Sequence, residues 1–201
     1  QNGLSFIQVA EGSLQQINDI LQRVRMLSVQ SANVIYSNAD RMQIQVEVSQ
    51  LIEEVDRITT SAEFTRMKML TGMYARNSKT GSMFFHVGPN QGQRMRAFIA
   101  TMSSKALNLV DGAKKRSIST VGLANSMIGY IDLALDKLNR QRADLGAYYN
   151  RMENTISALS RNYENMLAAD SRIRDADMAS EMVEFTKNQI LGKNGTAMLA
   201  Q

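Results

Sequence analysis

The first third of the chain carries an apolar stripe of helical spacing. Between residues 14 and 35, apolar side chains recur three, four or seven positions apart, with a polar interruption at Ser28. The members of this stripe are Leu14, Ile17, Leu21, Val24 and Ile35. This spacing predicts one buried face of a helix. Its start is left open, because Ser13 with Gln16 fits a capping box, whereas a helix through Gly12 costs only about 1 kcal/mol.

A second helix is predicted after the turn-forming stretch "YSNAD", residues 36–40. Asp40 is the expected N-cap, with Gln43 three residues further on. The apolar stripe that follows alternates strictly between spacings of four and three. It consists of Ile44, Val48, Leu51, Val55 and Ile58. Such alternation is typical of helices that pack against one another in coiled-coil fashion.

The middle of the chain favours β-structure. Gly88, Pro89 and the glycine at position 92 indicate a turn, and β-favouring residues flank it on both sides. We expect a hairpin with strands near residues 82–87 and 94–101. Alternation places one set of side chains on one face and the other set on the opposite face. The first set is Met83, Phe85 and Val87, and the second is Phe84 and His86.

The longest pattern runs through the C-terminal half. Its members are Ile128, Ile131, Leu135, Leu138, Arg142, Leu145, Tyr149, Met152, Ile156, Leu159, Tyr163 and Met166. One helix over residues 121–173 would span about 80 Å at 1.5 Å per residue. A compact globule of this size would be only about 40 Å across, so an elongated rod is predicted. Arg142 interrupts the stripe and needs a carboxylate partner or a path to solvent.

These patterns together predict a mainly α fold: an elongated rod of long antiparallel helices, packed coiled-coil fashion, with a small β-hairpin region. The expected rod core is Ile44, Leu51, Val55, Ile131, Leu135, Leu138, Leu145, Ile156 and Leu159. The expected organisation is rod helices over residues 1–72, the hairpin region over 73–112, the long helix over 113–176, and a last helical segment over 177–201.

The last segment is less regularly patterned than the others. Asp175 and Asp177 are its candidate capping residues. Its apolar set is Met178, Met182, Phe185 and Leu191.

Composition narrows the function classes. A hydrophobic content of 44% is enough for a folded core, and the absence of cysteine excludes disulfides and cysteine-based metal or nucleophile sites. The net charge is +4 and the isoelectric point is about 9.4, but the arginines are dispersed among acidic residues. The only basic run is residues 114–116, so no nucleic-acid partner is expected. No apolar stretch approaches the roughly 18 residues of a membrane span, so no membrane insertion is expected.

No residue pattern indicates catalysis, a cofactor or a metal. His86 has no second histidine or cysteine near it and is interpreted as structural. The stretch "DADMASE" lacks the glycine and glutamate of a calcium loop, and "GPNQGQ" lacks the lysine and serine of a phosphate loop. No HExxH motif is present, and the fourteen methionines suit packing. We therefore expect no enzyme activity and no cofactor.

The stretch "LQRVRMLSVQSAN", residues 21–33, places cationic residues between apolar ones at helical spacing. One interpretation of Arg23 and Arg25 is an ordinary solvated helix face. The other is a contact surface, because forked guanidinium groups suit ion pairs across lateral contacts between rods.

Two long stretches resemble a known family. "SFIQVAEGSLQQINDILQRVRMLSVQSAN" and "IQVEVSQLIEEVDRI" resemble the N-terminal rod of bacterial flagellin, and "LGAYYNRMENTISALSRNYENMLAADSRIRDADMASEM" resembles its C-terminal rod. The middle, with "AEFTRMKMLTGMYAR" and "SMFFHVGPNQGQRMRAFIATMSSKAL", is similar to the spirochaete class B flagellins, which form the core of periplasmic flagellar filaments.

The resemblance implies a hollow helical filament in which rod domains form an outer tube and terminal helices form an inner tube. Large variable domains are inserted at the rod tip of other flagellins, whereas here only a short stretch separates Leu109 from Val121. Their absence would leave the rod surface available to sheath proteins. The N-terminal terminal helix is expected to be missing from this sequence and the C-terminal one incomplete, so this chain alone is expected to be a soluble monomer that assembles poorly.

The resemblance also implies a site. In the family, the helix with the QRVR motif contacts axially stacked subunits and carries the patch that an innate immune receptor recognises. The matching residues are Gln22, Arg23, Leu27 and Gln30 on the first helix and Glu47 on the second. Met26 stands where many flagellins have glutamate, and this lost charge argues against receptor recognition more than against assembly.

The partners implied by the family are other copies of the chain, sheath proteins, an export chaperone with the export apparatus, and a filament cap, with the innate receptor as a further candidate. The implied location is the flagellum, in its periplasmic form. A hook–filament junction protein and a coiled-coil adaptor that binds a partner helix are the alternative interpretations.

Overall fold

The computed structural model describes most of the chain, in four stretches: residues 2–76, 83–112, 114–174 and 178–199. The chain divides into two compact units, residues 1–155 and 156–201, and helix α3 contributes to both. No described helix combines the length and apolarity that crossing a membrane requires.

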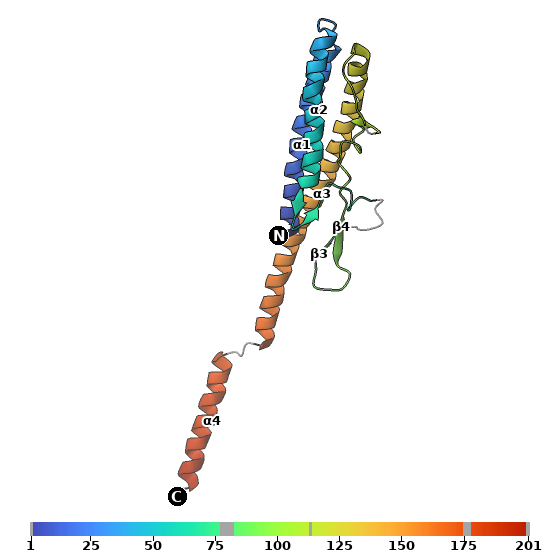
Figure 1. Ribbon diagram of the computed structural model, residues 1–201. Coiled ribbons are helices and arrows are strands. Elements are labelled where there is room, and N and C mark those ends of the chain that lie inside the picture. The colour runs from blue at the N-terminus through green and yellow to red at the C-terminus, as the bar shows by residue number, and fades with distance from the viewer. Residues whose placement is uncertain (1, 77–82, 113, 175–177, 200–201) are drawn as a thin grey trace. The chain divides into compact units, whose positions relative to one another are not determined.

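Helices α1 (Asn2–Ala32) and α2 (Asn38–Ser61) form an antiparallel hairpin in the first unit (Figure 1). Of the two starts that the sequence allows, α1 takes the longer one and passes through Gly12 without a break. The hydroxyl of Ser13 donates to the carbonyl of Val9 at 3.0 Å, as it does inside a helix, and caps nothing. The predicted stripe from Leu14 to Val24 is the buried face of this helix. Its last predicted member, Ile35, lies beyond the end of α1 and is 85% exposed, so that part of the prediction was wrong.

The N-cap of α2 is Ser37, and the prediction of Asp40 was wrong. The Asp40 backbone N–H donates to the Ser37 hydroxyl at 3.3 Å, and the Ser37 N–H donates to the Asp40 carboxylate at 3.0 Å. Hydrogen bonds from the Ser37 side chain, and then from its backbone, lower the pKa of the Asp40 carboxyl. Asp40 therefore completes a capping box from the third helical position, which the single-residue criterion for an N-cap overlooks.

Arg41 closes the turn between α1 and α2. Its side chain is buried, with only 5% of the residue exposed. The guanidinium donates to the carbonyls of Ser31 and Asn33 at 2.7 and 2.8 Å, and to the Asn38 side chain at 3.1 Å. The Ser31 carbonyl belongs to the last turn of α1 and the Asn33 carbonyl to the turn that follows, where a cation is favoured by the helix dipole. The arginine thus satisfies groups that the end of a helix leaves without partners.

Helix α3 (Val121–Arg174) confirms the predicted long helix, and α4 (Met178–Leu199) follows it in sequence. In the first unit α3 runs antiparallel to α1, because late residues of α1 meet early residues of α3. Arg25 binds Asp132 at 2.8 Å, and Arg142 binds Glu11 at 2.7 Å. The expected carboxylate partner of Arg142 is therefore Glu11. The candidate caps Asp175 and Asp177 lie outside the described residues.

The core of the first unit joins α1, α2, α3 and the segment that connects α2 to α3. Of the predicted core residues, Val55, Ile131, Leu138 and Leu145 are buried. Three more are partly buried and pack against the core: Ile44, Leu51 and Leu135.

The end of the predicted stripe is not core. Ile156 is partly buried. Leu159 is 37% exposed, so the prediction that it belongs to the core was wrong. The start of α1 reaches Met152, whose sulfur lies 3.1 Å from the position of a Cβ on Gly3. Periodicity identifies the apolar face of a helix, but it does not show how much of that face the same chain covers.

The connecting segment contains three two-stranded antiparallel pairs: β1 (Glu63–Phe64) with β2 (Met67–Lys68), β3 (Met83–His86) with β4 (Arg94–Ala97), and β5 (Val110–Asp111) with β6 (Lys114–Lys115). The predicted hairpin is β3–β4, with shorter strands than expected and with Phe84 opposite Arg96. Its faces are as predicted, because Met83 is buried and Phe84 is exposed. The pairs β1–β2 and β5–β6 were not predicted.

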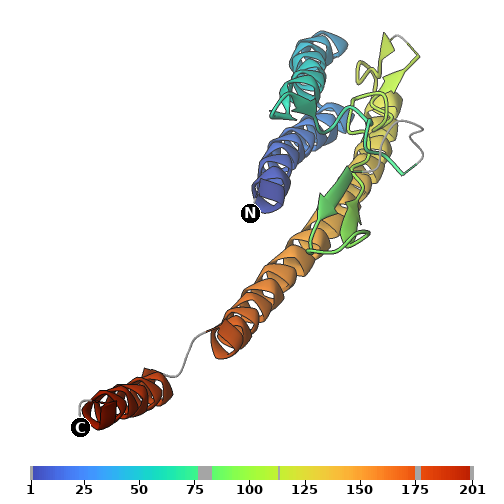
Figure 2. The same ribbon diagram turned by 90° about the horizontal axis from the view of Figure 1, so that it is seen from below.

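Helix α3 holds the connecting segment through one buried amide. The Gln141 side chain accepts from the Ala100 N–H at 2.9 Å and donates to the Phe98 carbonyl at 3.2 Å, as a neighbouring strand would. Helix α2 contributes Asp56, whose carboxylate accepts from the Ser104 N–H at 2.8 Å and from its hydroxyl at 2.6 Å. The bonds to Gln141 hold the residues that follow β4 against α3, and the β3–β4 hairpin lies beside this helix (Figure 2).

We expect Arg41→Met to lower the free energy of unfolding by about 2–3 kcal/mol, because buried carbonyls at the end of α1 lose their donor. Urea denaturation followed by circular dichroism measures this. Arg57→Met is the matched control, because exposed Arg57 pairs only with Glu54 on its own helix and contributes less than about 1 kcal/mol. Equal losses in the two variants would show that Arg41 contributes nothing beyond a surface arginine.

The turn of β1–β2 places Thr65 and Arg66 at φ values of 51° and 66°. A β-branched residue in this left-handed region is strained, and Asn-Gly is the preferred sequence for such two-residue turns. We expect Thr65→Asn with Arg66→Gly to stabilise the protein by about 1 kcal/mol in the same assay. Thr60→Asn, at an exposed helical position, should give no gain. A double variant less stable than wild type would contradict the strain argument.

Candidate interaction surface

The stretch singled out in the sequence forms the second half of α1, and the structure separates its residues into two groups. Leu27 is only 3% exposed and belongs to the core, together with Val24 at a spacing of three. Its assignment to a contact patch is therefore corrected, since a partner would reach it only by opening the helix packing. Gln22, Arg23 and Gln30 are exposed.

The exposed polar residues of this stretch make contacts inside the chain. Arg23 on α1 pairs with Glu47 on α2, with Nη2 and Oε1 2.8 Å apart and the two side chains 51% and 43% exposed. Gln30 donates to the Tyr36 hydroxyl at 3.1 Å. The structure thus brings together Arg23 with Glu47, but it does not join all five predicted residues into one cluster.

Arg25 links α1 to α3 on the other side. Its Nε donates to the Asp132 carboxylate at 2.8 Å. This hydrogen bond, and then the charge of Asp132, raise the pKa of the guanidinium above its usual value. Arg23 and Arg25 therefore lie on either side of α1 and connect it to its two neighbours. Each pair is exposed, so its contribution to stability is small, but both limit rotation of α1.

The part of α1 that points away from the core carries apolar residues that sequence reasoning did not select. Met26 is 59% exposed and Val29 is 49% exposed. Gln22, Met26 and Val29 are spaced by four and three, so they share one face. We call these three residues the outer α1 face. Val34 and Ile35, in the turn that follows, are also exposed. The sequence does contain a signal for this face. Met26 and Val29 are three residues apart, and they lie on a different side of the helix from the core stripe.

The second unit exposes a larger apolar surface. Its α3 residues Tyr163, Met166 and Leu167 are more than half exposed. The same holds for the α4 residues Met182, Val183, Phe185, Ile190, Leu191, Met198 and Leu199. Apolar surface of this extent marks a site of protein association.

The described residues contain no group of three or more side chains that suits a metal ion. His86 lies on the exposed face of the β3–β4 hairpin, opposite Arg94. A shallow groove between α1 and α3 is lined by apolar residues, including Ile7, Leu145 and Tyr149, with the Arg142–Glu11 pair inside it. The apolar lining of this groove suits contact with another protein surface.

We expect Arg23→Ala and Glu47→Ala each to lower the free energy of unfolding by less than about 1 kcal/mol, because both side chains are solvated. A double-mutant cycle should give a coupling energy of about 0.3–1 kcal/mol that disappears in 1 M salt. The Arg25–Asp132 pair provides the matched cycle. A coupling energy above about 2 kcal/mol would contradict this, because it would show that the Arg23–Glu47 pair is a major source of stability.

The geometry agrees with comparisons to known proteins. The bacterial flagellin N-terminal helical region matches residues 1–75, and the bacterial flagellin C-terminal helical region matches residues 128–201. The whole chain is 56% identical to the flagellar filament 33 kDa core protein of Treponema phagedenis and 55% identical to flagellin FlaB2 of Treponema pallidum (strain Nichols), and it covers 72% of each.

Among solved structures, the crystal structure of Bacillus cereus flagellin is similar in fold, with a TM-score of 0.66 and 24% sequence identity. The similarity covers 84% of this chain and 92% of that one. The two helical regions together match well over half of the chain, and the spirochaete proteins are far above 30% identical. The chain therefore belongs to the bacterial flagellin family, as a structural subunit of the flagellar filament.

Proposed function

We propose that this flagellin builds the core of a periplasmic flagellar filament and that the outer α1 face is one of its contacts with neighbouring subunits. The observation that carries the proposal is the contrast between two faces of one helix. Leu21 and Val24 are fully buried, whereas Met26 and Val29 are about half exposed. An apolar face without a partner in its own chain gains free energy when another subunit covers it.

The ion pairs of α1 prepare this face for binding. Because Arg23 is fixed to Glu47 and Arg25 to Asp132, α1 is restrained from both sides. A restrained helix loses less conformational freedom when a partner binds, so more of the contact energy remains for association. The predicted residues Arg23 and Glu47 thus support the contact, while Gln22, Met26 and Val29 make it.

The exposed helices of the second unit support a further part of the proposal. Residues 156–174 of α3 and residues 182–199 of α4 carry apolar side chains that the described chain leaves open to solvent. We propose that they pack with the same segments of neighbouring subunits in the inner part of the filament. The division into rod helices, hairpin region, long helix and terminal helix, with limits near residues 72, 112 and 176, remains our proposal for the functional parts.

Sheath proteins, an export chaperone with the export apparatus and a filament cap are the other partners that we propose. The 55–56% identity with Treponema filament core proteins supports a periplasmic filament. Recognition by an innate receptor has weaker support, because Met26 carries no charge and Leu27 is buried. The flagellin family is structural and not enzymatic, and we propose no catalytic role.

The alternative functions differ from a filament subunit in the size of the assembly that they form. A coiled-coil adaptor forms an assembly of fixed size with its partner helix, whereas a filament subunit keeps adding copies. A hook–filament junction protein shares parts of the rod, but the identity with filament core proteins extends over the entire chain. This identity favours the filament subunit.

We expect Gln22→Lys with Val29→Lys, in the full flagellin, to slow elongation from filament seeds at least about tenfold, because two charges must be desolvated at the contact. Light scattering measures the rate, and negative-stain microscopy shows the filaments. Thermal unfolding should remain close to wild type, because both residues are exposed.

The matched control is Asn139→Lys with Ala143→Lys, which adds the same charge to an exposed stretch of α3. It should elongate within about threefold of wild type, since added surface charge alone is screened by salt. Normal elongation of the Gln22 and Val29 variant would exclude the outer α1 face from assembly.

A further inference from the structure

Charge is unevenly divided along the chain. Residues 62–116, which connect α2 to α3, contain ten Lys and Arg against two Asp and Glu, a net charge of +8. The whole chain has a net charge of +4, so the remainder carries −4. The net positive charge of the protein therefore comes from the connecting segment, and the rest of the chain is slightly acidic.

Three arginines of this segment alternate with two phenylalanines. The guanidinium carbons of Arg94 and Arg96 lie 4.5 and 4.9 Å from the centre of the Phe84 ring. Those of Arg96 and Arg76 lie 5.9 and 5.4 Å from the centre of the Phe98 ring. The order is Arg94, Phe84, Arg96, Phe98, Arg76, and we call this set the arginine–phenylalanine ladder. All four distances are within the range of cation–π attraction.

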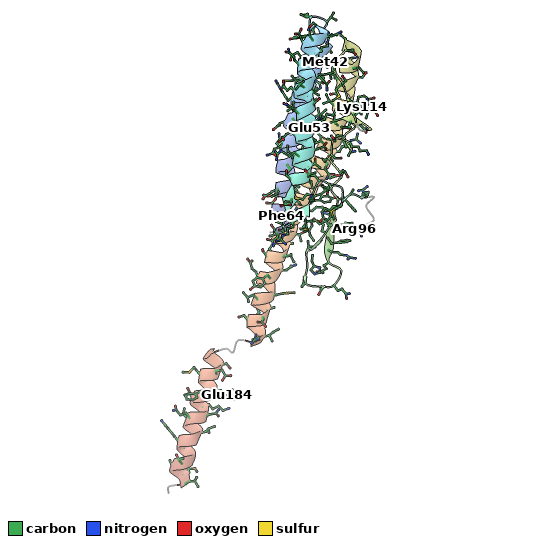
Figure 3. All side chains as sticks on the ribbon, in the orientation of Figure 1. Met42, Glu53, Phe64, Arg96, Lys114 and Glu184 are labelled. Atoms are coloured by element: carbon green, nitrogen blue, oxygen red, sulfur yellow. The ribbon has the colours of Figure 1, made fainter. Side chains whose placement is uncertain are left out.

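The β3–β4 hairpin builds the ladder. Phe84 lies directly opposite Arg96, and Arg94 is two residues from Arg96 on the same strand, so the three side chains share one face. Phe84 is 42% exposed, and Figure 3 labels Arg96 on this hairpin. On the other face Phe85 packs against Phe6, with ring centres 6.0 Å apart. The hairpin thus adjoins the start of α1, whereas the outer α1 face lies in its second half.

The arginines of the ladder differ from three arginines that join the helices of the first unit. Arg23, Arg25 and Arg142 each pair with a carboxylate. Across the described stretches of the chain, no carboxylate lies within ion-pair distance of Arg76, Arg94 or Arg96. The rings contact the guanidinium groups, and the N–H edges remain as donors. Such edges bind carboxylates in a forked geometry, so the ladder is a row of donors without acceptors.

We infer that the arginine–phenylalanine ladder is a docking surface for an acidic segment of another protein bound to the filament. The inference rests on the proposed function, because it assumes a filament that carries partner proteins. An extended chain places every second side chain on one face, about 7 Å apart. The shared rings limit the separation of successive guanidinium carbons to at most 9.4 Å (4.5 + 4.9 Å) for Arg94 and Arg96 and at most 11.3 Å (5.9 + 5.4 Å) for Arg96 and Arg76. The flexible side chains of Asp and Glu in an extended run can therefore reach successive guanidinium groups.

A second copy of the chain fits less well. On α3, Glu153 and Glu164 form no ion pair within the described chain, and eleven helical residues place them about 16 Å apart. On α4, Glu181 and Glu184 are one turn apart and supply only two carboxylates to three guanidinium groups. A nucleic acid also fits less well, because the phenylalanine rings already contact guanidinium groups, and base stacking requires an open ring.

The test is the binding of a fluorescently labelled ten-residue glutamate peptide to full flagellin, followed by anisotropy at physiological salt. Arg76→Gln, Arg94→Gln and Arg96→Gln together should weaken binding at least about tenfold, because the three donors are lost. The matched control is Arg66→Gln, Lys68→Gln and Lys105→Gln. It removes the same charge from the same segment and should weaken binding less than about threefold.

A conservative variant separates geometry from charge. Replacing all three ladder arginines by lysine keeps the charge but removes the planar forks, and it should weaken binding several-fold while leaving the circular dichroism unchanged. Equal loss in the ladder and control variants would overturn the inference, because diffuse charge would then explain binding. Tighter binding of an inorganic polyphosphate of equal charge would overturn it in favour of a phosphate ligand.

Filament growth distinguishes this inference from the proposed function. The ladder glutamine variant should elongate from seeds at the wild-type rate, since the ladder is separate from the outer α1 face. If it fails to elongate, a second copy occupies the ladder and the inference is overturned. Failure of the Gln22 and Val29 prediction would instead remove the proposed contact, and the peptide assay would still decide whether the ladder binds acidic segments.

Discussion

The burial of one face of α1 against α2 and α3 is the constraint on which the first unit depends. Phe6, Leu14 and Val24 lie along this face and are almost completely removed from solvent. Once that face is fixed, the opposite face must point outward, and the ion pairs of Arg23 and Arg25 fall on the two sides between them. Core packing therefore determines which residues of α1 are left on the surface, where we propose that a neighbouring subunit binds.

The same constraint explains what the sequence predicted well. A long apolar stripe, such as that from Ile131 to Leu145, arises because one face of the helix is buried. Its spacing therefore predicted the long helices and their packing against one another, and it showed that Arg142, within the stripe, needs a partner. The faces of the β3–β4 hairpin followed in the same way from alternation. The helices and the hairpin faces both depend on which side chains are buried, and a buried face produces a regular spacing of apolar residues in the sequence.

Features that depend on local competition or on other molecules were missed. Ser37 and Asp40 both suit a helix start, and only their mutual hydrogen bonds decide between them. Leu159 belongs to an apolar stripe that this chain does not cover. Leu27 was assigned to the contact patch from the family resemblance, although its spacing of three from Val24 places it in the core. Pairs of two residues, such as β1–β2, are too short to leave a pattern.

The two surfaces that we propose differ in their physics. The outer α1 face is apolar, and the adjacent charges are already paired, so association there depends little on salt. The ladder consists of cations without a carboxylate partner in the described part of the chain, so binding there weakens as salt screens the charges. A filament with both surfaces keeps its subunits together under ionic conditions that release a partner from the ladder. Segregation of net positive charge into residues 62–116 makes this separation possible, because the rest of the chain then has a net charge of −4.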